Sequence, residues 1–291
     1  SSEGFVFHSF SGDRILSVSN LEEISEVEFK SHNTNKTSSE QNKEDYNLKF
    51  DSLQKEIAKG RFQKIILSRT KTIQTQQNAV TIFKLLNQKY LNTLNYIISN
   101  PEIGTWIGAT PELLLSVEND KLKTMSLAGT KTANESWSEK EFEEQELVTE
   151  TILDRLKETQ CQNILIDGPT TIQAGKIEHL RTTFQASLSN KSNWAAVLKS
   201  LHPTPAVCGI PTEAAKQYIP TLEKYSREFY TGFIGIIDKS RKDFFVNLRC
   251  MQLHKEKAKL YIGGGITAQS NCEAEWKETE RKAETLASVL N

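Results

Sequence analysis

The hydrophobic and polar positions of this chain alternate between helical and extended patterns. Apolar residues recur at helical spacing in residues 46–57, and Gly60 then supplies a helix-ending position. The next apolar run, residues 64–73, is rich in β-branched side chains and predicts a strand. Ser138 and Glu141 form a capping box, which predicts the start of a long helix over 138–159. We expect the other helices at residues 79–91, 193–200, 212–218 and 272–290.

Extended segments occur in neighbouring groups rather than singly. Short strands are expected at residues 5–8, 15–18, 106–108, 113–117, 163–167 and 175–188. A long hairpin is predicted from residues 229–238 and 244–253, which would place Arg249 inside an apolar strand. A strand at 259–262 is expected to lead into a turn at Gly263–Gly265. Because strict β-α-β alternation is absent, the pattern indicates an α+β fold with largely antiparallel sheets.

The N-terminal part differs in composition from the rest of the chain. Residues 31–45 are polar and almost free of apolar anchors. Such a segment cannot bury enough surface to offset the entropy of ordering, so we expect a mobile loop. We therefore assign residues 1–45 as N-terminal strands and a mobile polar loop that belong to the same domain as residues 46–291.

Composition narrows the range of partners. The net charge of −1 provides no global field that would attract nucleic acid or a membrane surface. No apolar run approaches the roughly 20 residues of a membrane span. The four cysteines form no Cys-x-x-Cys pair, which favours free thiols in a reducing compartment and hence a cytoplasmic protein. We expect a monomer without nucleic-acid or membrane partners, because no long exposed apolar helix is evident.

Several charged residues fall on apolar faces of the predicted elements. Glu144 shares a helix face with Val148 and Ile152, where a carboxylate must be paired or bind a cation unless it lies at the solvated edge. Glu275 and Glu278, three apart on the last helix, could present oxygens to one Mg²⁺. The pattern alone favours a simpler alternative, a solvated pair of Glu278 with Lys282 that stabilises the helix by ~0.3–0.5 kcal/mol.

For the remaining candidates, the sequence pattern does not decide between a functional and a purely structural role. The amides of Gly263–Gly265 could approach a ligand closely, but the segment lacks the ending of a nucleotide-binding P-loop. Arg249 either binds a carboxylate or points outward from its strand. His179 and His202 could both be ordinary core histidines.

Ordered sequence blocks between residues 46 and 290 nevertheless resemble a known family, the chorismate-binding enzymes. These include isochorismate synthases, salicylate synthases, and the large subunits of anthranilate and aminodeoxychorismate synthases. The blocks are KIILSR (64–69), GATPELLL (108–115), LAGT (127–130), EEQELV (143–148), EHLRT (178–182), LHPTPAVCGIP (201–211), REFYTGFIG (227–235), NLRC (247–250) and GGGITAQSNCEAEWKETERK (263–282).

This resemblance implies a fold, a substrate and a cofactor. The fold would be two orthogonally packed, largely antiparallel sheets flanked by helices. The substrate would be chorismate, a dicarboxylate, and the cofactor Mg²⁺, with Glu144, Glu275 and Glu278 matching the metal-site carboxylates. Glu112 matches the general acid that protonates the departing C4 hydroxyl, so it must be held protonated near neutral pH.

The family also implies the groups that hold the substrate. Arg249 and Tyr230 match residues that bind the enolpyruvyl carboxylate, and the amides of Gly263, Gly264 and Gly265 would bind carboxylate oxygen. The remaining matches are Lys282 near the ring carboxylate, Gly129 and Thr130 in the LAGT block, and His179, which is nearer the ring than His202.

Lys64 distinguishes the branches of the family. Members that use ammonia carry a Gln-like residue at this position, whereas members that use water carry lysine, whose neutral amine can deprotonate water as it attacks C2. Thr212 replaces the lysine of ammonia users and points the same way. The HPTPAVCG block (202–209) resembles isochorismate synthases, of the menaquinone or siderophore type, more than salicylate synthases. A salicylate synthase, an amine-transferring enzyme and an inactive chorismate-binding module are the alternatives.

Overall fold

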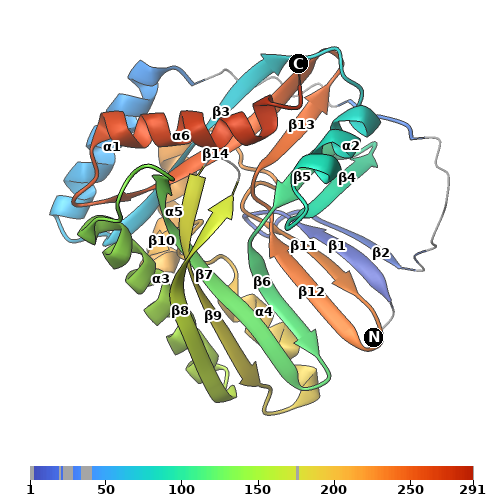
Figure 1. Ribbon diagram of the computed structural model, residues 1–291, viewed down its shortest axis with the longest axis vertical. Helices are drawn as coiled ribbons and strands as arrows, with labels where there is room; N and C mark the ends of the chain where they lie inside the picture. The colour runs from blue at the N-terminus through green and yellow to red at the C-terminus, as the bar shows by residue number, and fades with distance from the viewer. Residues whose placement is uncertain (1–2, 20, 22–28, 34–40, 175–176, 291) are drawn as a thin grey trace.

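The structure is a computed structural model that describes residues 3–19, 21, 29–33, 41–174 and 177–290. Within these residues the chain forms two antiparallel sheets with helices packed around them (Figure 1). The expected α+β class with largely antiparallel sheets flanked by helices is confirmed. In the described part of the chain, no helix is long and apolar enough to span a membrane.

The larger sheet contains eight of the described strands in the order β2-β1-β11-β12-β6-β7-β9-β8. Its N-terminal strand β1 pairs with β11, so the first strands belong to the same sheet as residues more than 200 positions later. In chain order the strands are β1 (Gly4–His8), β2 (Ile15–Ser19), β6 (Leu113–Glu118), β7 (Lys121–Thr132), β8 (Gln162–Ala174), β9 (Ile177–Ser187), β11 (Phe233–Ile237) and β12 (Arg241–Val246).

The smaller sheet contains six described strands in the order β10-β3-β14-β13-β5-β4. The neighbouring strands β3 and β14 pair antiparallel along eleven residues, which places Lys64 opposite Thr267. The strands are β3 (Lys64–Gln74), β4 (Leu94–Asn100), β5 (Gly104–Thr110), β10 (Gly209–Ile210), β13 (Cys250–His254) and β14 (Lys257–Thr267).

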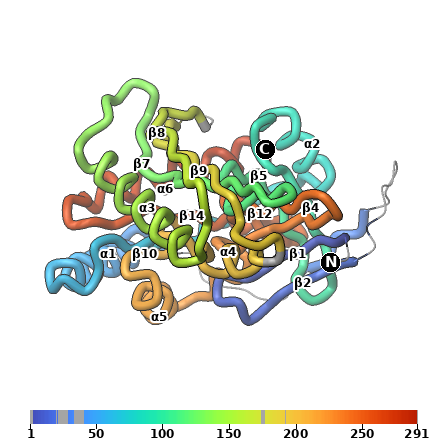
Figure 2. Tube along the Cα trace, turned by 90° about the horizontal axis from the view of Figure 1, so that it is seen from below, coloured from blue at the N-terminus to red at the C-terminus, as the bar shows by residue number. Residues whose placement is uncertain are grey.

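The helices bury their apolar stripes against these sheets. They are α1 (Lys43–Ala58), α2 (Ala79–Lys89), α3 (Glu139–Glu158), α4 (Trp194–Leu201), α5 (Thr212–Glu223) and α6 (Cys272–Ala287). The expected capping box of Ser138 and Glu141 is present at the start of α3, whose buried Val148 and Ile152 join the core of the larger sheet. The red helix α6 lies across β14 (Figure 1), and α1 and α2 lie on opposite sides of the molecule (Figure 2).

The expected long hairpin of residues 229–238 and 244–253 forms only between β11 and β12 and is wrong at both ends. The chain leaves the larger sheet at Val246 and enters the smaller one at Cys250, so Arg249 lies in the crossing segment with a φ of 45° rather than in a strand. Residues 229–232 form a turn that hydrogen-bonds to Asn247 instead of extending β11. The largely apolar stretch 244–253 is buried or half-buried along its whole length, in the first sheet, in the crossing and in the second sheet, and this hides the crossing.

Two further expectations need correction. Gly263–Gly265 do not form a turn but continue β14, where they pair with residues 66–68 of β3. The polar segment 31–45 is also not a loop throughout, because α1 begins at Lys43 with Asn42 as its cap. Residues 34–40 of that segment, and residues 175–176 of the strand expected at 175–188, lie outside the described residues.

A fully buried ion pair joins the elements behind the cavity. The guanidinium of Arg227 donates from Nε and Nη2 to the Glu223 carboxylate at 2.8 and 2.7 Å. Glu223 also accepts from the backbone N–H of Ser68 on β3 at 2.8 Å. Arg227 donates further to the carbonyls of Val207 and Ile66 at 2.8 and 3.0 Å. The pair therefore fixes α5, β3 and the segment before β10 relative to one another.

Replacing Glu223 should destabilise the fold strongly. Glu223→Gln leaves the Arg227 charge buried without a compensating carboxylate, and we expect the free energy of unfolding to fall by about 3–5 kcal/mol in a urea titration. Glu213→Gln, at an exposed position in the first turn of the same helix, is the matched control and should change it by less than about 0.5 kcal/mol. Equal urea midpoints of unfolding for Glu223→Gln and Glu213→Gln would contradict a stabilising role of the Glu223–Arg227 pair.

Candidate active site

A cavity between the two sheets gathers most of the residues that the sequence singled out. Its walls come from β3, β7, β9 and β14, from α3 and α6, and from the segment that crosses between the sheets. The expected site residues that line it are Lys64, Glu112, Gly129, Thr130, Glu144, His179, Tyr230, Arg249, Gly263, Gly264, Gly265 and Lys282. Glu275 and Glu278 are not part of the lining but approach Gly264 from α6.

Lys64 begins β3 and forms an ion pair across the cavity. Its Nζ lies 2.8 Å from Oε1 of Glu144, and the lysine side chain is 1% exposed. Glu144 therefore points inward from α3 and does not lie at the solvated edge of the helix. Gly265 makes room for the pair, because a Cβ there would lie 2.5 Å from the Glu144 carboxylate and 2.9 Å from Cε of Lys64.

Glu112 follows Pro111 in the turn between β5 and β6. Its backbone is fixed by the hydrogen bond from the Val246 N–H to its carbonyl at 3.0 Å, and Thr204 Oγ1 donates to its carboxyl group at 3.5 Å. Burial raises the pKa of Glu112 to about 8, although Lys64 and Lys282 act in the opposite direction. At neutral pH the group is therefore mostly protonated and can donate a proton.

Arg249 is held by a neutral histidine. Burial, together with Arg249 and Lys282, lowers the pKa of His179 to about 3. Arg249 Nη2 lies 3.0 Å from Nε2 of His179, and since arginine only donates, Nε2 must be the acceptor. Nδ1 then carries the hydrogen and donates to the Gly129 carbonyl at 3.0 Å, with Thr130 Oγ1 at 3.2 Å. This arrangement fixes both the tautomer and the direction of the guanidinium.

The same guanidinium has unused binding capacity. Nη1 of Arg249 is buried and has no hydrogen-bond partner among the described residues. Burial lowers the pKa of Arg249 to about 10, which leaves it charged at neutral pH. A buried cation with an unpaired donor at a cavity wall is suited to an anionic ligand.

The acids expected to hold Mg²⁺ are each paired with a different lysine. The pairs are Lys64 with Glu144 at 2.8 Å, Lys140 with Glu275 at 2.7 Å, and Lys282 with Glu278 at 2.6 Å. Lys282 also donates to the carbonyl of Gly263 at 3.2 Å. Within the described residues, no three His, Cys, Asp or Glu side chains are close enough together to form a metal site.

The donor chemistry of α6 still fits a hard cation. A Cβ on Gly264 would lie 3.6 Å from Oε2 of Glu275 and 3.7 Å from Oε1 of Glu278, so both carboxylates face the same short stretch of β14. Burial, followed by the charge of Glu278, raises the pKa of Glu275. Two neighbouring carboxylates, one of them buried, favour a nearby positive charge, and oxygen ligands are those that Mg²⁺ prefers.

The sequence analysis missed two residues that contact site residues, Lys140 and Thr204. Two residues that it did single out, His202 and Thr212, lie outside the cavity. Lys140 could have been found from its i, i+4 spacing to Glu144, whereas the contact of Thr204 with Glu112 had no local signal. His202 is outside the cavity and packs against Phe233 and His8. Thr212 starts α5 and accepts from Arg155 at 2.6 Å, so it does not line the cavity either.

Comparison with known proteins agrees with this geometry. The family model described as chorismate binding enzyme matches residues 11–291. The isochorismate synthase EntC of Escherichia coli K12 is 30% identical over 78% of this chain and 62% of its own length, and MenF of the same strain is 31% identical over 81% and 58%. The chain thus spans about 60% of the length of these relatives.

A solved structure extends the similarity to nearly the whole chain. The crystal structure described as a putative 2,3-dihydroxybenzoate-specific isochorismate synthase, DhbC, from Bacillus anthracis superposes with a TM-score of 0.85. It is 26% identical, and the match covers 99% of this chain and 84% of that one. With the family model matching almost every residue and the expected side chains gathered in one cavity, the chain belongs to the chorismate-binding enzyme family.

Proposed function

We propose that this protein converts chorismate to isochorismate. The observation that carries the proposal is that a buried lysine, Lys64, and a buried carboxylic acid, Glu112, line the same cavity. The relatives named isochorismate synthases support it, since they match about four fifths of the chain. The reaction replaces the C4 hydroxyl by a hydroxyl at C2, so it needs one group to accept a proton from water and another to donate one.

Glu112 supplies the proton for the departing hydroxyl. Hydroxide is a poor leaving group, and protonation as the C4–O bond breaks lowers the barrier. The pKa of about 8 keeps the acid in its protonated form at neutral pH. The proton therefore moves from the Glu112 carboxyl to the C4 oxygen, which leaves as water.

Lys64 accepts the proton from the water that attacks C2. In the structure its Nζ is ion-paired with Glu144 at 2.8 Å. The amine can accept a proton only in its neutral form, so Lys64 must first release to solvent the proton that it holds in this pair. Glu144 must therefore pair with another positive charge when chorismate is bound and Lys64 is neutral.

Arg249 and Lys282 are suited to the two carboxylates of chorismate. The unpaired Nη1 of Arg249 and the hydroxyl of Tyr230 would hold the enolpyruvyl carboxylate, while His179 keeps the guanidinium in place. Lys282, with the backbone of Gly263–Gly265, would hold the ring carboxylate. Both sets of contacts orient the ring between Lys64 and Glu112.

Mg²⁺ is proposed as the cofactor, with Glu144, Glu275 and Glu278 as its protein ligands. When bound, it would neutralise these acids and polarise the ring carboxylate of the substrate. The lysines that pair with them in the structure, Lys64, Lys140 and Lys282, would then be released to other partners.

The activity is tested by following the products of chorismate. The purified protein with chorismate and Mg²⁺ should form isochorismate, resolved by chromatography, and EDTA should abolish the turnover because the acids of α6 would lose their cation. Salicylate with pyruvate would instead identify a salicylate synthase, and an aminated product formed with ammonia an amine-transferring enzyme. No product at all would indicate a chorismate-binding module without catalysis.

Removing the proposed base should separate binding from turnover. Lys64→Ala is expected to lower kcat by roughly 10²–10⁴-fold, the usual contribution of general base catalysis, while chorismate still binds in a calorimetric titration. Lys71→Ala, on the same strand but paired with Glu280 outside the cavity, is the control and should keep kcat within twofold. Near-normal turnover by the Lys64 variant would remove Lys64 from this role.

The protonation state of Glu112 predicts how kcat changes at alkaline pH. Because the acid form is needed and burial raises the pKa to about 8, kcat should be highest below pH 8 and fall above it. Glu112→Gln keeps a neutral side chain of similar shape but cannot donate an acidic proton, so kcat should fall roughly 10²-fold or more. Glu118→Gln, exposed at the end of β6, is the control. An unchanged rate between pH 7 and 9 would refute the assignment.

A further inference from the structure

A second cleft adjoins the cavity and carries only positive charge. This outer cleft, of ≈ 670 Å³, lies between the segment after α2 and the exposed faces of β7, β8 and β9, and Pro111 and Arg249 line both it and the inner cavity. Its charged lining consists of Lys89, Arg181 and Arg249, and the described residues that line it include no acid. In a chain whose net charge is −1, this is a local concentration of cations.

The two spaces are continuous along the strands of the larger sheet. On β9, His179 lines the inner cavity and Arg181, two residues on, lines the outer cleft. On the paired strand β7, Leu127 lines the inner cavity and Met125, two residues before it, lines the outer cleft. Residues two apart on a strand share a face and lie about 7 Å apart, so Arg181 is one step outward from the histidine that holds Arg249.

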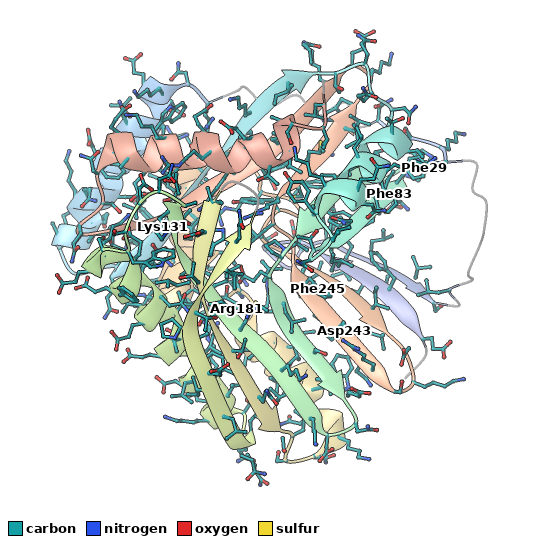
Figure 3. The ribbon with its side chains drawn as sticks, viewed as in Figure 1. Phe29, Phe83, Lys131, Arg181, Asp243 and Phe245 are labelled. Atoms are coloured by element: carbon teal, nitrogen blue, oxygen red, sulfur yellow. The ribbon has the colours of Figure 1, made fainter. Side chains whose placement is uncertain are left out.

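The side chain of Arg181 has no hydrogen-bond or ion-pair partner among the residues that the structure describes. Its side chain is half-buried, and its Nε is buried without a hydrogen-bond partner among the described residues. No carboxylate in the described part of the chain forms an ion pair with it. The side chain extends from β9 near the centre of the view in Figure 3, whereas Lys131, on the neighbouring strand, is already paired with Glu178.

The opposite wall provides the third cation and an aromatic edge. Lys89, the last residue of α2, donates one hydrogen bond from its ammonium Nζ to Ser288 Oγ at 2.6 Å, which holds the charged group at the rim and leaves its other N–H donors for a ligand. Tyr90, the next residue, donates to the Thr285 carbonyl at 3.0 Å and is therefore rigid as well. The positive charges therefore lie in a cleft whose wall is held by hydrogen bonds, and they are more than two side chains exposed by chance.

We propose that the outer cleft is a docking subsite for a small dicarboxylate, in which Arg181 and Lys89 hold chorismate before it passes to Arg249. The inference rests on the proposed function, because it takes the dianionic substrate from there. Two negative charges near Arg181 are attracted through a cleft with low-dielectric walls, which raises the local substrate concentration at the inner cavity. Arg249, which borders both spaces, completes the transfer from the outer cations to the inner site.

The experiment measures kcat and kcat/KM for chorismate over a series of NaCl concentrations. In Arg181→Gln, kcat/KM should be lower than in the unaltered protein by roughly 3- to 10-fold at low salt, because one charge close to a dianion is lost. Above about 0.5 M salt the two proteins should differ in kcat/KM by no more than twofold, because charges are then screened within a few ångströms. The value of kcat should stay within twofold, since Arg181 does not touch the reacting atoms.

Two control variants separate charge at this position from charge elsewhere. Arg181→Lys keeps the charge and should retain the salt dependence of the unaltered protein. Lys239→Gln makes the same change of net charge in the exposed β11–β12 turn and should also behave normally. A loss in Arg181→Gln that persists at high salt, a matching loss of kcat, or an equal loss in Lys239→Gln would overturn the subsite.

Failure of the subsite is distinguishable from failure of the proposed function. If the unaltered protein turns chorismate over but Arg181→Gln shows the same kcat/KM and salt slope, the subsite is refuted and the activity stands. If the unaltered protein has no activity, the proposed function fails, and calorimetric titration of both proteins with chorismate decides the subsite. Equal affinities, or no binding to either protein, then refute it.

Discussion

The glycine stretch of β14 is the constraint on which the candidate site depends. At Gly265 a single added methyl group would collide with the Glu144 carboxylate and with the Lys64 stem, and at Gly263 it would lie 2.8 Å from the Tyr230 hydroxyl. Because these glycines pair regularly with β3, they remain a flat wall rather than a loop. Charged side chains from three elements can therefore meet above one strand in a space that no larger residue would leave open.

Charge compensation explains how so many ionisable groups remain buried around this wall. Lys64, Lys140 and Lys282 each neutralise one acid, and a neutral His179 holds Arg249 without cancelling its charge. The cavity consequently has one buried cation whose donor is unpaired within the described residues. The protonated Glu112 in the same lining adds no negative charge at neutral pH. The resulting surface is suited to an anionic ligand and provides both an acid and an amine for its chemistry.

The outer cleft extends the same electrostatic pattern toward solvent. Residues two apart on β7 and β9 share a face, and this face passes from the inner cavity to the outer cleft, which Arg181 and Arg249 both line. Farther back, the Glu223–Arg227 pair holds β3 and the segment before β10 in place. The ion pair therefore supports the strand that carries Lys64, while Arg249 borders both the inner cavity and the outer cleft.

The sequence by itself determined the local elements: the apolar periodicity of residues 46–57, the glycine at position 60 and the Ser138 capping box are short-range signals, and each element formed where it was expected. Ordered motifs also indicated the family and nominated the site residues. Tertiary structure alone decided that the apolar run at 244–253 divides between two sheets and that the three glycines form a strand. It also determined the partner of each acid and placed Arg181 and Arg249 in the lining of one cleft, because contacts between distant residues depend on strand register and packing, which no local pattern encodes.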